Sequence, residues 1–192
     1  MGYWSRAETE LLINLEGRDP ALAHIITNWP AYINRLQQCQ GYQQSAEWIA
    51  PDGKKEINGQ VSLTPFRFIH LRAKLAESAV AEWKQAKLEL PELEQVESPF
   101  RLGPGERETI ISATQEDGFW AWVCTDMMWW MKTLEDNDWA VLVKEVAYAG
   151  ADDGGSAVQQ TYAVPRALIQ IRKSRPQLTD EQRGKLIDRL KS

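Results

Sequence analysis

The stretch Phe119–Trp139, FWAWVCTDMMWWMKTLEDNDW, decides the fold that the sequence predicts. It holds five of the nine tryptophans of the 192-residue chain. Its first six residues are aromatic, apolar and β-branched, which favours a strand. Thr125 or Asp126 can then cap a helix from Met127 to about Glu135. Four apolar residues recur along that helix at helical spacing, namely Met127, Trp130, Met131 and Leu134.

The sequence on either side of this stretch supplies more strands. Residues Glu108–Thr114 alternate apolar and polar side chains, and Asp117-Gly118 is a hairpin-turn signal. Further strands are predicted over Trp139–Tyr148 and Gln160–Ile171. We therefore expect the C-terminal half to be α+β, with a small antiparallel sheet and packed helices.

Two residues of the predicted helix lie opposite its apolar stripe. These are Met128 and Trp129, and the acidic residues Asp136 and Asp138 follow the helix. Either the N-terminal part of the chain covers Trp129, or a partner molecule does, because exposed aromatic patches mark interfaces. On the second alternative, all four residues are candidate partner-binding residues.

The N-terminal half carries signals for helices. Ser5 and Glu8 form a capping box before a helix over residues 5–16, and Asp19-Pro20 opens a second helix that Pro30 ends. A third helix is expected to continue as far as Ile49. These patterns predict a helical N-terminal half.

The first of these helices resembles a known DNA-binding family. WSRAETELL, from Trp4 to Leu12, is similar to the opening of Myb/SANT-like helix-turn-helix domains. The resemblance implies DNA binding, with Asn34–Cys39 in the place of the recognition helix and Arg35 as its basic residue. Glutamines near this segment can pair with adenine, or form a solvated helix face.

A break with two turn signals, over residues 50–64, precedes a long predicted helix from Pro65 to about Leu90. A helix of that length can form a homo-oligomer contact. Trp48–Gly53 and Leu63–Pro65 resemble the middle of phage small-terminase proteins, which implies DNA packaging and ring formation. The predicted strands of the C-terminal half have no place in that family.

We expect three parts along the chain: a helical domain over residues 1–95, a proline-punctuated linker over 96–104, and an α+β domain over 105–192. The fold class is thus α+β, with an N-terminal helical half followed by a small antiparallel sheet. The layout of the C-terminal part is similar to that of uncharacterised phage and mobile-element proteins. That resemblance implies no particular activity.

Charge is unevenly distributed along the chain. The net charge is −5, yet residues 166–192 hold eight Lys and Arg against three Asp and Glu. A basic segment of this kind indicates a nucleic-acid contact, or a solvated helix with a few charged strand residues. The candidate nucleic-acid contacts in it are Arg166, Arg172, Lys173 and Arg175.

Several chemistries find no support in the sequence. Cys39, Cys124, His24 and His70 show no zinc spacing, so both cysteines are expected to be reduced and inert. Asp152 and its neighbours lack the spacing of a calcium loop. No catalytic residue, metal site or cofactor is predicted. The chain shows no membrane-spanning run and no signal peptide, so a cytoplasmic location in a bacterial host is expected.

Two functions follow from these observations. In the first, the chain is a non-enzymatic phage or mobile-element protein that associates with nucleic acid. In the second, it is an anti-defence inhibitor, similar in action to anti-CRISPR proteins, which binds a host effector complex through an acidic, tryptophan-rich surface.

Overall fold

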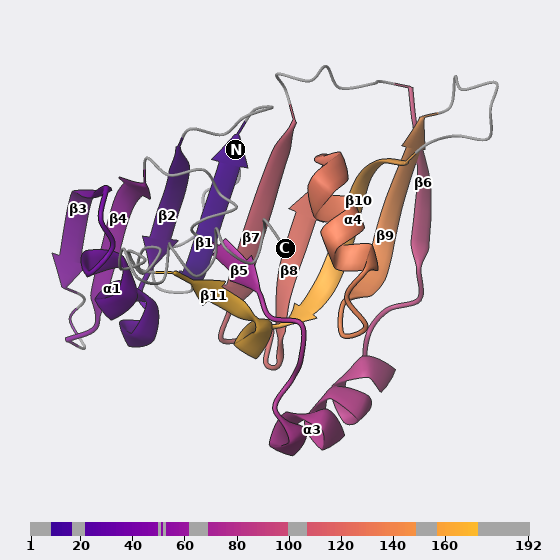
Figure 1. Ribbon diagram of the computed structural model, residues 1–192, viewed down its shortest axis with the longest axis horizontal. Coiled ribbons are helices and arrows are strands. Elements are labelled where there is room, and N and C mark those ends of the chain that lie inside the picture. Colours follow the sequence, from indigo (N-terminus) through magenta and orange to yellow (C-terminus); the bar gives the residue numbers. More distant parts are fainter. Residues whose placement is uncertain are drawn as a thin grey trace, which may run out of the picture.

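The computed structural model describes residues 9–16, 22–49, 51, 53–61, 69–99, 107–148 and 157–172. The largest element of the fold is one nine-stranded sheet with the order β3-β4-β2-β1-β7-β8-β10-β9-β6 (Figure 1). All neighbours are antiparallel except β6 and β9, which are parallel. The strands are β1 (Thr9–Glu16), β2 (Ala23–Thr27), β3 (Tyr42–Ile49), β4 (Lys55–Val61), β6 (Glu94–Ser98), β7 (Glu108–Thr114), β8 (Trp120–Thr125), β9 (Val141–Tyr148) and β10 (Ala157–Pro165).

The other elements are short. β5 (Ile69–Leu71) and β11 (Ile169–Ile171) pair antiparallel as a separate two-stranded ribbon. The helices of the described chain are α1 (Pro30–Gln37), α3 (Glu77–Leu88) and α4 (Met128–Glu135), with one 3₁₀ turn, η1 (Arg166–Leu168).

The prediction of a helical N-terminal half is wrong, because that half contributes the four strands β1 to β4 to the nine-stranded sheet. The described parts of the predicted first and second helices are β1 and β2. Alternate residues of β1, namely Leu11, Ile13 and Leu15, are almost fully buried, so a period of two decides this segment. The leucines also fit helical spacing, but burial of alternate residues in the core of the sheet stabilises the strand.

The later N-terminal elements agree with the prediction only in part. The predicted third helix begins as α1, whose first turn starts at Pro30, but it ends before Gly41. Gly41 has a φ of 86°, which lets the chain reverse into β3. The predicted helix over residues 65–90 contains the strand β5 and the shorter helix α3.

The predictions for the C-terminal half are confirmed within one or two residues for four elements. They are the strand β7, the strand β8, the helix α4 and the strand β9. The predicted strand over Gln160–Ile171 is divided, because η1 separates β10 from β11. The predicted terminal helix over residues 180–190 lies outside the described residues.

The sheet joins both halves of the sequence. Ile13 on β1 pairs with Ile25 on β2 and with Ile111 on β7. All three side chains are fully buried. Strands on both sides of the predicted linker over 96–104 therefore share one core, while the division of the chain into domains stays a prediction.

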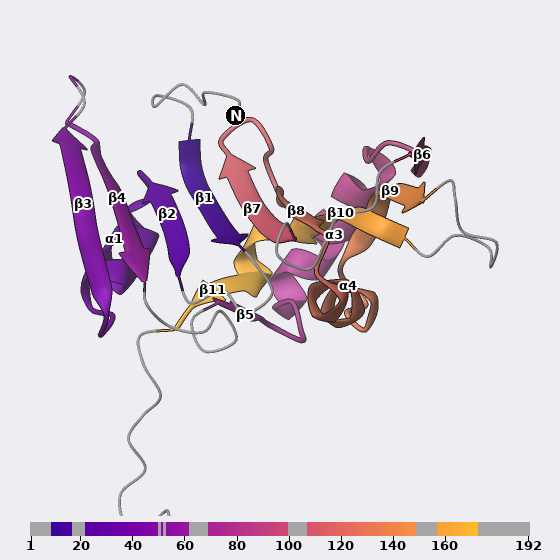
Figure 2. The same ribbon diagram turned by 90° about the horizontal axis from the view of Figure 1, so that it is seen from above.

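The main core lies on one face of the sheet. α1, α4 and the β5–β11 ribbon cover that face, and Figure 2 shows the ribbon and α4 on the same side of the central strands. Leu36 of α1, Leu134 of α4 and Ile171 of β11 are almost completely buried there. The ribbon thus closes the core between the two helices.

α3 packs on the opposite face. Its Trp83 and Ala86 contact a second, smaller cluster built on Trp120, Val143 and Ala163. Trp120 and Ala163 have the opposite strand parity to the fully buried Ala121 and Val164, so their side chains point away from the main core. The indole nitrogen of Trp83 donates to the carbonyl of Trp139 at 3.1 Å, which fixes α3 on this face.

Candidate functional site

The structure brings together two arginines that lie far apart in the sequence. Arg35 is exposed on α1, and Arg172 is exposed directly after β11. The Cys39 thiol lies between their backbones, 3.1 Å from the carbonyl oxygen of Arg35 and 3.3 Å from that of Arg172. Two of the predicted nucleic-acid contacts therefore share one surface.

A third arginine extends this surface across the ribbon. The backbone N–H of Arg72, which follows β5, donates to the carbonyl of Leu168 at 2.9 Å. His70 on β5 pairs with Gln170 on β11. The pKa of His70 is lowered, first by burial and then by the positive charges of Arg172 and Arg72, so both arginines lie near it.

We call Arg35, Arg72 and Arg172 the arginine surface. All three side chains are exposed. Within the described ranges, none of their guanidinium groups forms an ion pair with a carboxylate. The surface therefore presents positive charge to solvent on a chain whose net charge is −5.

Arg166, another predicted contact, is engaged inside the protein. Its guanidinium lies 2.7 Å from Glu10 Oε2 and donates to the carbonyl oxygens of Thr114, at 3.2 Å, and Gly118. It also lies over the Trp29 ring, 5.3 Å from the ring centroid. Arg166 thus joins β1, the β7–β8 hairpin and the start of α1. The remaining predicted contacts, Lys173 and Arg175, lie outside the described residues.

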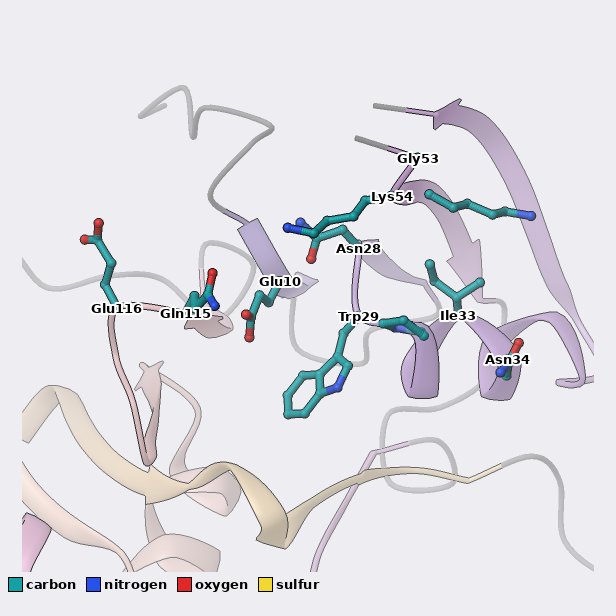
Figure 3. Close-up of a pocket in the computed structure, with 11 residues that line it drawn as sticks. Glu10, Asn28, Trp29, Ile33, Asn34, Gly53, Lys54, Gln115 and Glu116 are labelled. Carbon is teal, nitrogen blue, oxygen red and sulfur yellow. The ribbon is translucent and has the colours of Figure 1, made fainter. Parts of the chain in front are cut away.

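Trp29 stands between two cavities. The smaller one has a volume of about 190 Å³ and is lined by Arg35, Arg166 and Gln170 beside the ribbon. The larger one has a volume of about 640 Å³ and lies between the start of α1 and the β7–β8 turn. Figure 3 shows Gln115 and Glu116 of that turn on the opposite side of the larger cavity from α1.

Side-chain amides line the larger cavity. Asn28, Asn34 and Gln115 all contribute to its wall, and their amide groups form no hydrogen bond with another side chain or backbone group of the described residues. The charged groups are mixed: Glu10 is paired with Arg166, and Lys55 is paired with Glu47 at 2.9 Å. The cavity therefore combines an indole with amide groups and carries no excess of either charge.

The sequence analysis missed the residues of this cavity. Trp29 was placed at the end of a predicted helix, whereas it is the residue before α1 and contacts Tyr32 at a ring-centroid distance of 5.0 Å. The Trp-Pro pair at residues 29 and 30 was the available signal for a helix start there. No sequence pattern connects α1 with Gln115, because the sheet alone brings them together.

The predicted partner-binding residues are divided between the two ends of α4. Met128 is 67% exposed at its first turn, while Asp136 and Asp138 are exposed beyond its last turn. Trp129 is half-buried against the core and contacts Trp130 at a ring-centroid distance of 4.9 Å. α4 spans about 12 Å, so Met128 and the two aspartates do not form one compact patch.

Two searches of the described residues concern other kinds of site. No three His, Cys, Asp or Glu side chains among them are grouped so that they could hold a metal ion. None of the described helices combines the length and the apolar character needed to cross a membrane. Comparisons of the chain with protein-family models, with curated proteins and with solved structures found no match.

Proposed function

We propose that the chain binds nucleic acid through the arginine surface, as a non-enzymatic accessory protein in the bacterial cytoplasm. The observation that carries the proposal is the meeting of Arg35, Arg72 and Arg172 on the ribbon side of the molecule. These residues come from three separate segments, and each has an exposed guanidinium.

Phosphate groups are the ligand that such a surface fits. A guanidinium binds phosphate oxygens through two parallel hydrogen bonds, and it stays charged at every physiological pH. Because the three arginines lack carboxylate partners within the described chain, phosphate binding need not break an existing ion pair. Gln170, which pairs with His70 across the ribbon and precedes Arg172 by two residues, adds a neutral hydrogen-bonding group.

Arg166 has a different part in this proposal. It is held by Glu10, by two carbonyl groups and by Trp29, so it forms part of the wall of the smaller cavity and does not reach a phosphate. We therefore assign the phosphate contacts to the arginine surface alone.

The test is binding of a fluorescein-labelled oligonucleotide, followed by fluorescence anisotropy over a series of salt concentrations. The double variant Arg35→Ala/Arg172→Ala should bind more weakly than the unmodified chain. Its slope of log affinity against log salt should fall by roughly 0.7–0.9 for each lost phosphate contact.

The matched control is Lys84→Ala/Lys132→Ala, which removes the same charge from exposed residues on α3 and α4. A similar loss in both double variants would contradict the proposal, since general charge would then explain the binding. The inhibitor function is supported in its place if the chain binds no oligonucleotide and a pull-down from nuclease-treated bacterial lysate recovers a protein complex with it. The exposed Met128 of α4 favours that second function.

A further inference from the structure

The larger cavity beside Trp29 adjoins the arginine surface. Trp29 lines both cavities, and Arg35 lines the smaller one. Arg35 follows Trp29 by six residues, which corresponds to about 9 Å along a helix. A molecule that contacts Arg35 can therefore extend past Trp29 into the larger cavity.

The lining of the larger cavity concentrates no positive charge for a phosphate. Its two lysines, Lys54 and Lys55, are balanced by Glu10 and Glu116, and the Lys55 ammonium is paired with Glu47. Phosphates gain most where positive charge is concentrated, which here is the arginine surface outside the cavity. An uncharged planar group suits the cavity better than a charged one.

The polar groups of the cavity suit the edge of a nucleobase. Asn28, Asn34 and Gln115 carry amides, and each amide both donates and accepts hydrogen bonds. The Trp29 indole lines the cavity, and the part of its ring that the Arg166 guanidinium does not cover offers an aromatic surface against which a base can stack. The cavity has a volume of about 640 Å³, which is within the range of roughly 300–1,000 Å³ found for small-ligand pockets.

We infer that the larger cavity is a binding site for an unpaired base of a single-stranded nucleic acid. The base stacks on Trp29, and the amides of Gln115 and Asn34, which lie on opposite sides of the cavity, form hydrogen bonds with this base or with the adjacent nucleotide, while the neighbouring phosphates lie on the arginine surface. This inference rests on the proposed function. The strand must be single, because a base inside a duplex is stacked between its neighbours and cannot enter a cavity.

The experiment compares two labelled strands of equal length, one with normal bases and one in which every position is abasic. Both strands carry the same phosphates, so they differ only in the bases, which can stack and form hydrogen bonds. The unmodified chain should bind the normal strand roughly 5- to 150-fold more tightly, the range that stacking of one base gives. Trp29→Leu should lose most of that preference while its affinity for the abasic strand changes little.

Trp48→Leu is the matched control, because Trp48 is half-buried on the edge strand β3 and lines neither cavity. Trp29 also packs against the core, so thermal unfolding must show that its variant is folded. Asn34→Ala/Gln115→Ala gives a second variant that removes only exposed side chains. It should reduce the preference for the normal strand and leave the melting temperature close to that of the unmodified chain.

The outcomes separate the two proposals. If the chain binds both strands equally and with a steep salt dependence, the base site is overturned and the proposed function stands. If Trp29→Leu and Asn34→Ala/Gln115→Ala both keep the full preference, the base site is also overturned. If the unmodified chain binds neither strand, both proposals fall together.

Discussion

Two buried tyrosines on the same side of the sheet lie in opposite electrostatic surroundings. Tyr32 belongs to α1 near the ribbon, and its hydroxyl donates to the carbonyl of Ile169 at 2.8 Å. Tyr162 lies on β10, and its hydroxyl donates to Gln160 Oε1 at 2.9 Å. Both are under 10% exposed, at 8% and 2% respectively.

The charges near the two hydroxyls have opposite signs. Burial raises the pKa of Tyr32 to about 12, and Arg166 and Arg35 pull it back toward its ordinary value. Burial also raises the pKa of Tyr162, but there Glu135 and Glu145 raise it further. The comparison teaches that arginines act on the buried tyrosine of α1 and glutamates on the buried tyrosine near α4, and we call these two regions the positive α1 end and the negative α4 end. The exposed Arg35 makes the first the better place for a polyanion.

The largest expected effect separates the two kinds of arginine at the α1 end. Arg166→Ala should lower the free energy of unfolding by roughly 2–4 kcal/mol, because it leaves Glu10 and two carbonyl groups without their partner. Arg35→Ala should change it by less than about 0.5 kcal/mol, because its side chain is exposed. Urea unfolding of both variants measures the difference. Equal losses of unfolding free energy would show that Arg166 and Arg35 do not differ in their contribution to stability.

The next effect concerns alkaline pH. The folded-state pKa of Tyr32 is about 12, above the value near 10 of an unfolded tyrosine, so the unfolded chain loses this proton first. The stability that Tyr32 contributes is therefore complete below about pH 10 and is lost as pH rises toward 12. For this one group the loss is on the order of 3 kcal/mol.

Tyr32→Phe tests this dependence directly. Its free energy of unfolding should fall less steeply between pH 10 and 12 than that of the unmodified chain. Tyr162→Phe should likewise make the alkaline loss shallower, since the pKa of Tyr162 is raised as well. Urea unfolding at several pH values provides the measurement, and an unchanged slope in Tyr32→Phe would contradict the assignment of its pKa.

The sequence predicted the negative α4 end better than the positive α1 end. Strict alternation in β7, the aromatic and β-branched run of β8 and the D-G turn between them agree, and α4 carries an apolar stripe at helical spacing, so local signals determine these elements. The predicted capping by Thr125 or Asp126 is wrong, because the N-cap of α4 is Met127 and no side chain caps it. In β1 and β2 the apolar residues fit two periods at once. The decision between them comes from Ile111, about 100 residues away, which packs beside Ile13 in the register of the sheet.

The candidate site divides in the same way. Arg35 and Arg172 were predicted separately, one from a resemblance of the N-terminal segment and one from the basic segment near the end of the chain. Nothing local places them on either side of the Cys39 thiol. The smaller cavity at Trp29 and the position of Arg72 depend on the β5–β11 ribbon. This ribbon pairs residues about 100 positions apart, and no spacing in the sequence indicates that pairing.

The smallest expected effect tests the charges of the positive α1 end and the negative α4 end themselves. Arg35→Ala removes a positive charge near Tyr32 and should raise the pKa of that tyrosine by a few tenths of a unit, the size of a screened interaction near the surface. Glu135→Gln removes a negative charge near Tyr162 and should lower the pKa of that tyrosine. Tyrosine-ring NMR shifts followed against pH resolve both residues in one sample. Shifts in the same direction would mean that the two regions do not differ in sign, and the reason for placing a polyanion at the α1 end would then be lost, because charge would no longer distinguish that end from the α4 end.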